Sequence, residues 1–431
     1  MSKIRVGVVI DAESVPTEGG GHAYYNRLLK GINDFSFNEN VDIVNVVFYA
    51  GKVPELQLTK RSIYIKTGYG SKAKRPFRIR GFKYANLYLN KATSFLNFIL
   101  HTFITNRNKK VERALRENGI DLLYYLKPRY AVLNFPFIAT HWDIAHRSVY
   151  AFPEMIMNGE YEAREEYYLY TLNKAMFILC ESDTGAKELL NFYALYKSKV
   201  KVVPAFGGNI INLEVPSDTQ KTVLDKFGLV NQSYFLYPAQ FWAHKNHYNL
   251  IVAFAKLLAE RKQTHLQMVL CGSDKGNAAY IQELVNSLGL NGQVKLLGFV
   301  PDSDLSVLYQ NALALTMATF LGPTNMPLIE AAHLSCPVLC SDLEGHREIL
   351  GDHALYFDPA DSNSIKHALI QVLDNGFRSK HSLSAQEYIR SSKFNLSNSL
   401  SELNAILVSA ISIRRTWGLN FLFKREEAPS D

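Results

Sequence analysis

Residues Phe320–Glu330 read FLGPTNMPLIE, and the chain continues AAHLSCPVLCSDLEGHREILGDHALYFDP. A short apolar run at Ala312–Thr316 precedes this segment and predicts a buried strand. The Gly-Pro-Thr-Asn sequence is typical of a loop, and Pro327 suits the first turn of a helix. The segment therefore predicts a strand, a loop and a helix in succession, which is the repeating unit of a parallel sheet.

The same alternation of short apolar runs and helical periods extends over nearly the whole chain. Strands that are almost continuously apolar are expected where helices cover both faces of a sheet. The predicted fold class is therefore α/β, with two facing Rossmann-like domains, parallel sheets and an interdomain cleft. We expect these domains at residues 1–211 and 212–392, followed by a helix or tail at 393–431 that packs back on the first domain. The polar segment Asn212–Asn231 is interpreted as the linker.

The individual elements follow from the same periodicity. The predicted strands are Ile4–Ile10, Val41–Phe48, Leu122–Leu126, Met176–Cys180, Val200–Val203, Tyr234–Tyr237, Leu266–Cys271, Val294–Leu297, Ala312–Thr316, Pro337–Cys340 and Ala354–Phe357. The predicted helices are His22–Phe35, Lys110–Asn118, Tyr161–Leu172, Thr184–Tyr193, Asn246–Arg261, Ala278–Leu288, Asp302–Gln310, Pro327–Leu334, Gly345–Leu350 and Ser362–Asp374.

Composition indicates a globular protein that stays in the cytoplasm. The chain has 431 residues, of which 47% are hydrophobic. Its most lipid-like stretch, Ala92–Thr105, falls short of the roughly 18 apolar residues that a membrane span needs. The N-terminal sequence MSKIRVGVVIDAE contains no visible secretory signal. Four cysteines at the ends or starts of apolar runs predict buried thiols without metal-site spacing, and no metal is expected: Cys180, Cys271, Cys336 and Cys340.

Positive charge is concentrated in the first third of the chain. The net charge is +7, and Lys52–Lys91 holds eleven basic residues against the single acid Glu55. A basic stretch attracts phosphates. A solvated basic face and peripheral contact of residues 52–91 with an anionic membrane both remain open, because aromatic residues interleave and follow the basic stretch. No recognised nucleic-acid-binding module occurs, so no nucleic acid partner is expected.

The segment quoted at the outset resembles the donor-binding signature of family 4 retaining glycosyltransferases of the GT-B type. The subgroup that it resembles carries a G-P-T-N-x-P-x-x-E-A core, then C-P-V and G-H-R-E. The matching residues are Gly322, Pro323, Thr324, Asn325, Pro327, Glu330, Ala331, Cys336–Val338 and Gly345–Glu348. The resemblance implies transfer of a hexosyl unit, with mannose as the first candidate, from a nucleotide-diphosphate sugar in polysaccharide or lipopolysaccharide biosynthesis. It places the acceptor on the first domain and the donor on the second, without an obligatory metal or other cofactor.

Glu330 and the start of its helix are the strongest site candidates. Exposed N–H groups at a helix start favour an anion such as a diphosphate. By position alone, Glu330 either favours the helix dipole or accepts hydrogen bonds from a ribose; the resemblance implies the ribose role. The family pattern places a further glutamate eight residues earlier, where this chain has Gly322. Backbone groups or Asn325 would have to take its place near the sugar.

The segment Pro238–His247, PAQFWAHKNH, supplies a second candidate group. A lysine at a helix start can meet the charge that develops on a leaving diphosphate, and the resemblance assigns this role to Lys245. The family has an arginine where this chain has Gln240, so His244 or Arg347 is expected to supply the missing charge. An exposed helix-start lysine is the alternative.

Strand-end loops supply the remaining candidates, because ligands of open parallel sheets lie beyond the carboxyl ends of the strands. In ATHWDIAHR, residues 139–147, the resemblance places His141 near the donor sugar, with Asp143 orienting it or binding a hydroxyl; a structural histidine is the alternative. The other expected donor contacts lie in the glycine run of residues 19–21 and in two loops of the second domain: Gly20, Gly21, Gly272, Phe299 and Val300.

Two other functions fit the same residues. Gly322 and Gln240 depart from the family pattern, which suits a GT-B protein that binds a nucleotide sugar without transferring it. Another GT-B enzyme, such as an epimerase or a phosphorylase, is the third possibility.

Overall fold

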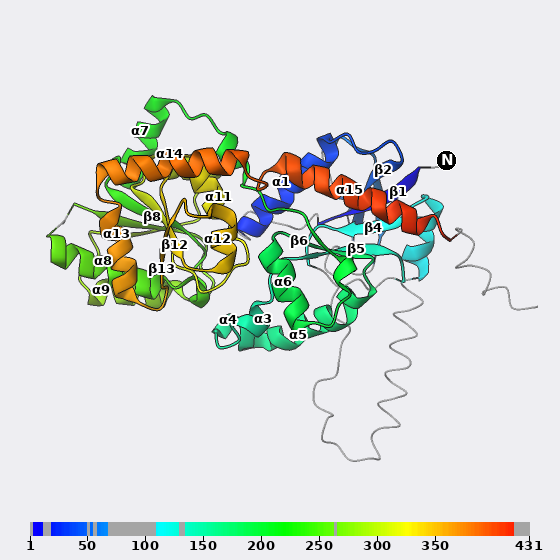
Figure 1. Ribbon diagram of the computed structural model, residues 1–431, viewed down its shortest axis with the longest axis horizontal. Helices are drawn as coiled ribbons and strands as arrows, with labels where there is room; N and C mark the ends of the chain where they lie inside the picture. Colours follow the sequence, from blue (N-terminus) through cyan, green and yellow to red (C-terminus); the bar gives the residue numbers. More distant parts are fainter. Residues whose placement is uncertain are drawn as a thin grey trace, which may run out of the picture.

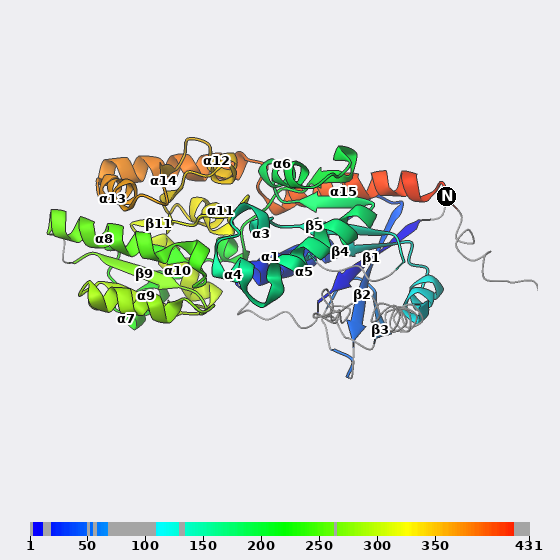
Figure 2. The same ribbon diagram turned by 90° about the horizontal axis from the view of Figure 1, so that it is seen from below.

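The computed structural model describes residues 3–11, 19–49, 52–54, 58–67, 109–128, 134–262 and 265–417 (Figure 1). These residues form two parallel sheets that lie beside one another along the long axis of the molecule (Figure 2). The first has seven strands in the order β3-β2-β1-β4-β5-β6-β7, and the second has six in the order β10-β9-β8-β11-β12-β13. The predicted α/β fold class with two Rossmann-like domains is confirmed.

The strands are short and mostly buried. Those of the first sheet are β1 (Ile4–Ile10), β2 (Val41–Tyr49), β3 (Ser62–Lys66), β4 (Leu122–Tyr125), β5 (Phe137–His141), β6 (Phe177–Cys180) and β7 (Val200–Val202). Those of the second are β8 (Tyr234–Pro238), β9 (Gln267–Cys271), β10 (Val294–Gly298), β11 (Ala314–Met317), β12 (Val338–Ser341) and β13 (Leu355–Phe357). The order reverses beside β1 and beside β8, so each sheet has a switch point where a ligand crevice is expected.

Helices cover both faces of each sheet (Figures 1 and 2). The first domain contains α1 (Gly20–Asp34), α3 (Ala145–Ser148), α4 (Pro153–Ile156), α5 (Glu160–Glu166) and α6 (Asp183–Phe192). The second contains α7 (Ser217–Phe227), α8 (His247–Arg261), α9 (Ala278–Ser287), α10 (Asp302–Asn311), α11 (Met326–His333), α12 (Glu344–Leu350), α13 (Ser362–Gln371) and α14 (Asn375–Ser391). All four cysteines are buried and free, as predicted from their apolar surroundings.

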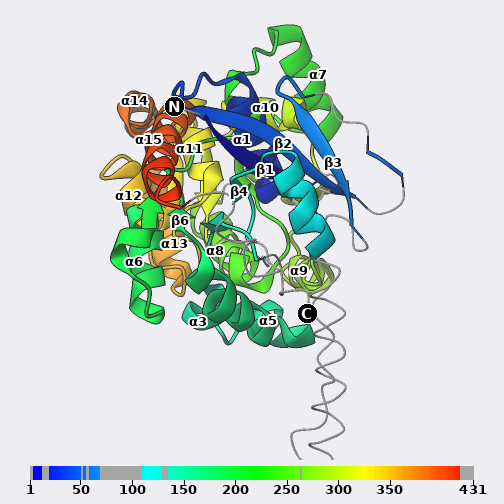
Figure 3. The same ribbon diagram turned by 90° about the vertical axis from the view of Figure 1, so that its right-hand side faces the viewer.

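The last described helix, α15 (Leu396–Arg414), returns to the first domain. Its residues Leu403 and Leu407 join the core formed by α1, β1 and β2, and Figure 3 shows α15 beside α1. Arg414 at its end forms an ion pair with Asp121 over 3.1 Å. The stretch Asn375–Arg414 is long and apolar enough to cross a membrane by length and composition. In this structure it comprises two helices, α14 and α15, which pack on different domains.

Several sequence-based element predictions need correction. The segment interpreted as a linker contains α7, whose Val223 and Leu224 are buried; its polar composition concealed the narrow apolar side. The strands β3 and β5 and the helices α3, α4 and α14 were not among the predicted elements, whereas α15 lies within the helix or tail predicted at 393–431. The predicted helix at Tyr161–Leu172 begins as α5 and passes into a π-helix at Tyr167–Thr171.

Some predictions lie outside the described residues. Of the basic stretch 52–91, only residues 52–54 and 58–67 are described, and the aromatic residues that follow are not. The tail beyond Trp417 also lies outside these ranges.

Candidate functional site

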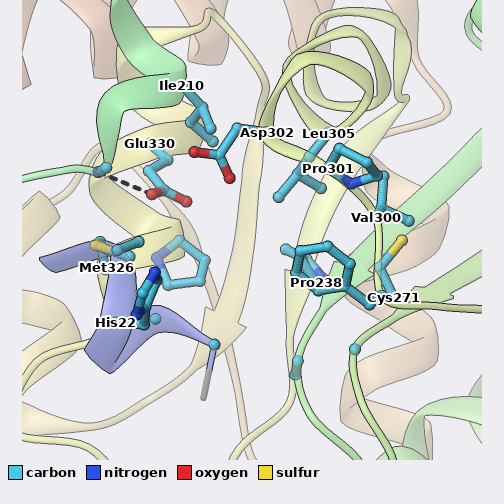
Figure 4. A pocket seen from close by; sticks show the side chains of 18 of the residues that line it. His22, Ile210, Pro238, Cys271, Val300, Pro301, Asp302, Leu305, Met326 and Glu330 are labelled. Carbon is cyan, nitrogen blue, oxygen red and sulfur yellow. Dashed lines mark hydrogen bonds between the residues drawn. The ribbon is translucent and has the colours of Figure 1, made fainter. Parts of the chain in front are cut away.

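A cleft of about 390 Å³ lies between the start of α1 and the strand-end loops of the second domain (Figure 4). The first domain contributes Gly19, Gly20, His22, Ala23 and Asn26, and the connecting segment contributes Gly208, Asn209 and Ile210. The second domain contributes Pro238, Ala239, Gln240, Cys271, Gly272, Ser273, Phe299, Val300, Pro301, Asp302, Leu305, Tyr309, Met326, Pro327 and Glu330. The cleft thus opens at the carboxyl ends of β8, β9 and β10, beside the switch point of the second sheet.

Glu330 places a buried carboxylate in this cleft. It lies in α11, which begins at Met326 with proline in its first turn. The backbone N–H of Gly208 donates to its Oε1 over 2.9 Å, and the hydroxyl of Tyr309 donates to its Oε2 over 3.1 Å. Figure 4 shows the first of these bonds and the side chain of Asp302 nearby. The carboxylate is therefore held in one orientation by the connecting segment and by the second domain.

The surroundings of Glu330 change its acidity. Burial raises its pKa to about 7, and the charge of Asp302 acts in the same direction. The hydrogen bonds from Gly208 and Tyr309 oppose this rise. A carboxyl that titrates near neutrality in a cleft is typical of a functional site.

Other predicted donor contacts meet in the same cleft. Gly20, Gln240, Gly272, Phe299 and Val300 all line it. The backbone of Gly272 has φ +153°, and a Cβ there would lie 2.4 Å from the carbonyl oxygen of Ala239. This glycine is needed because two backbone segments approach closely beside the cleft.

The Gln240 side chain is held by neighbours of its own domain. Its Nε2 donates to the hydroxyl of Ser273 over 3.0 Å, and its Oε1 accepts from the indole N–H of Trp242 over 3.1 Å. The amide thus lines the cleft at the position where the resembled family carries an arginine, and it brings no charge.

The loop Gly322–Asn325 does not line the cleft but immediately precedes the part of α11 that does. Pro323 accepts a hydrogen bond from the hydroxyl of Ser182, and Thr324 donates to the carboxylate of Glu181 over 2.9 Å. These contacts join the loop Gly322–Asn325 to the first domain. Burial raises the pKa of Glu181 to about 7.

Lys245 contacts the same loop. Its Nζ donates to Oδ1 of Asn325 over 3.2 Å, and Asn325 in turn donates to Nε2 of His346 over 2.9 Å. Burial lowers the pKa of Lys245 to about 8. Because Asn325 precedes the cleft-lining Met326 and Pro327, the ammonium group lies close to the helix start without lining the cleft.

His141 and Asp143 are at the end of β5, outside the cleft. His141 is completely buried, and burial lowers its pKa to about 4, so the ring is neutral. Tyr168 donates its hydroxyl hydrogen to the carbonyl of Asp143 and lies 2.9 Å from Nδ1 of His141. The ring therefore donates through Nδ1, which leaves Nε2 as an acceptor; Nε2 has no partner among the described residues. Asp143 does not bond to His141; it accepts from Arg164 over 2.5 Å.

Neither side chain expected to replace the missing arginine charge is available to the cleft. The backbone N–H and ring Nδ1 of His244 both donate to Oε1 of Glu154, across the domain boundary. Arg347 is exposed and donates to both carboxylate oxygens of Asp342. Gly21 does not line the cleft either, since a Cβ there would meet the ring of Trp142 at 3.3 Å.

Sequence analysis missed four residues that hold or shape the site: Gly208, Tyr309, Asp302 and Arg27. Arg27, on α1, donates through Nη1 to the carbonyls of Gly207 and Gly208. The pair of glycines in AFGGN, residues 205–209, was the available signal for the contact between Gly208 and Glu330. Only the fold brings Tyr309 to Glu330. Within the described ranges, no group of three or more His, Cys, Asp or Glu side chains is placed to hold a metal ion.

Comparison with known proteins assigns this architecture to a class. The structure of WaaG, a glycosyltransferase involved in lipopolysaccharide biosynthesis, superimposes with a TM-score of 0.63 at 15% identity and covers 92% of this chain and 98% of that one. Anabaena Alr3699/HepE, solved with UDP and glucose, gives a TM-score of 0.64 at 14% identity over 94% of this chain and 100% of that one. The chain has the two-domain fold of GT-B glycosyltransferases.

A sequence match gives the family of the second domain. Residues 220–391 match the family model described as Glycosyl transferases group 1. The O-antigen chain mannosyltransferase B of Escherichia coli is 26% identical over 238 residues, which cover 55% of this chain and 61% of that relative. The chain thus spans less than two thirds of the length of this curated relative. The matched region includes Gln240, Lys245 and Glu330, so these residues lie in a glycosyltransferase group 1 domain.

Proposed function

We propose that this protein is a retaining glycosyltransferase of family 4 that transfers a hexosyl unit from a nucleotide-diphosphate sugar to a saccharide or lipid-linked saccharide. Mannose, carried by GDP, is the first donor to test, because the Escherichia coli relative is described as an O-antigen mannosyltransferase. Assembly of surface polysaccharide or lipopolysaccharide on the cytoplasmic side of a membrane is the corresponding process. No metal ion or other cofactor is assigned a role.

The position of Glu330 is the observation that carries this proposal. Its carboxylate faces the cleft in the first turns of α11, where backbone N–H groups favour a diphosphate. A ribose attached to that diphosphate would offer its hydroxyl groups to Glu330. Phe299 and Val300, after β10, then flank the space left for the base.

The remaining residues suggest how the transfer proceeds. The bond between the sugar C1 and the diphosphate oxygen breaks, and the acceptor oxygen forms its bond to C1 on the same face. The acceptor proton passes to the departing phosphate oxygen, so charge and atoms balance. Lys245, in the short 3-10 helix just before α8, and the amides at the start of α11 stabilise the charge on the departing diphosphate. His141 has an Nε2 without a partner among the described residues, but its ring is completely buried, so contact with a sugar hydroxyl would require the surrounding side chains to move.

A second function is favoured by Gln240 and Gly322. Neither provides the charge or carboxylate that the resembled family has at its position, and neither His244 nor Arg347 replaces it. A protein that binds a nucleotide sugar without transferring it would also fit these residues.

Nucleotide release from a panel of nucleotide sugars distinguishes the two functions. With a lipid-linked saccharide acceptor, transfer predicts acceptor-dependent release, and NMR of the product should show the anomeric configuration of the donor. Binding of a donor without release for any acceptor would favour the non-catalytic function, and an inverted product would contradict the retaining assignment. Glu283→Ala, an exposed glutamate on α9, is the matched control for Glu330→Ala.

A further inference from the structure

A second cavity, of about 440 Å³, lies at the junction between the domains and shares no lining residue with the donor cleft. We call it the hinge cavity. Three basic side chains line it, Arg27, His333 and Arg390, and they come from α1, α11 and α14. Figures 1 and 3 show these helices converging near the start of α15. No carboxylate is among the residues that line it.

The guanidinium of Arg27 has little compensation for its burial. Arg27 is 8% exposed, and its Nη1 donates hydrogen bonds to two backbone carbonyls. Nε2 of His333 is buried without a hydrogen-bond partner among the described residues, whereas Arg390 is exposed to solvent. A buried guanidinium is normally paired with an anion, and no carboxylate lines this cavity, so the cavity is suited to an anion.

The other residues that line the cavity supply backbone hydrogen-bond donors and apolar surface. Asn395 is the N-cap of α15, a helix of 19 residues, and its side chain accepts from the N–H of Asn398. The first-turn amides of Leu396 and Ser397 remain as donors on the same side. Phe206 and Phe394 supply apolar surface.

We propose that the hinge cavity is a second anion-binding site, for a small molecule that carries a phosphate or diphosphate group. The guanidinium groups of Arg27 and Arg390 bind the phosphate oxygens, because planar guanidinium groups match that geometry. The two phenylalanine rings contact the rest of the molecule. This site is separate from the donor cleft, and the proposal does not depend on glycosyl transfer.

Calorimetric titration with pyrophosphate tests this site. Arg390→Glu reverses a charge at an exposed position, so the variant should fold, and its affinity for pyrophosphate should fall at least about tenfold. The double variant His333→Ala/Arg390→Ala should show a similar loss. Arg261→Ala, an exposed arginine at the end of α8, is the control and should bind as the unmodified protein does.

Binding at the donor cleft is separated by Lys245→Ala. This variant weakens only binding at the cleft that contains Glu330, so the pyrophosphate binding that Arg390→Glu removes should remain in it. Equal affinity in Arg390→Glu and the unmodified protein would overturn the proposal. Failure of the unmodified protein to bind pyrophosphate at millimolar concentration would overturn it as well.

Discussion

The backbone N–H of Gly208 donates to Oε1 of Glu330 over 2.9 Å, although 122 positions separate the two residues. Gly208 belongs to the segment that connects the two domains, and Glu330 lies in the cleft between the domains. The orientation of the carboxylate therefore depends on the connection between the domains. A change in that segment should therefore alter nucleotide binding by moving the carboxylate of Glu330.

Gly208→Ala tests this dependence. An added Cβ would lie 2.6 Å from Oε1 of Glu330, so the carboxylate must move or the segment must shift. We expect nucleoside diphosphate affinity to fall about tenfold and unfolding free energy to fall by about 1–3 kcal/mol. Gly292→Ala is the control, because no atom lies within 4 Å of its added Cβ. Equal affinities in the two variants would disprove the dependence.

The charge of Lys245 should make nucleotide binding sensitive to pH. Burial lowers its pKa to about 8, so the unliganded protein loses this positive charge as the pH rises through 8. A bound diphosphate favours the charged form, so affinity should decrease by up to about tenfold per pH unit above 8. Lys245→Met should bind more weakly and lose this pH dependence. An unmodified protein whose affinity is constant from pH 7 to 9 would exclude Lys245 from the diphosphate site.

Gly322 should not accept the glutamate of the family pattern. Its φ is +146°, and a Cβ there would lie 2.0 Å from Nδ2 of Asn325. Gly322→Ala should lose about 1–3 kcal/mol more unfolding free energy than Gly276→Ala, which also has positive φ but open space. Chemical denaturation measures this difference. Gly322→Glu should not raise the rate of nucleotide release, and a higher rate would show that the loop accommodates the side chain.

Glu348 should stabilise the contact between the domains more than its neighbour Glu344. Its carboxylate accepts from the N–H groups of Asp183 and Thr184 at the start of α6 and pairs with Lys393. Glu348→Ala should reduce the unfolding free energy by about 1–3 kcal/mol. Glu344→Ala removes one exposed ion pair, so the loss should stay below about 1 kcal/mol. Equal losses in thermal denaturation would show that the helix-start contact contributes nothing.

Much of the fold could be predicted from local sequence. Apolar runs such as Ile4–Ile10 gave strand boundaries that match the structure, because parallel strands covered on both faces must be continuously apolar. The strand β5 was not recognised, since Thr140 and His141 are polar and their burial depends on distant contacts with Tyr125 and Tyr168. α7 was hidden by its largely polar exposed surface.

The candidate site was predictable only in part. Strand-end loops and the donor motif led to Glu330 and Gly272, which line the cleft. The sequence carried no signal for Tyr309 as a partner of Glu330, because the two residues meet only when the second domain folds. It carried none for Glu154 as a partner of His244, because this pair forms only when the two domains pack together. His141 and Lys245 lie outside the cleft, and their proposed roles still depend on binding and turnover measurements.

The central claim is that Glu330 holds a nucleoside diphosphate in the interdomain cleft. The most direct test is the dissociation constant of GDP, UDP and ADP for the unmodified protein and for Glu330→Ala, with Glu283→Ala as the control. We predict that at least one nucleotide binds the unmodified protein and the control alike, and binds Glu330→Ala at least about tenfold more weakly. Equal binding by Glu330→Ala would contradict the account.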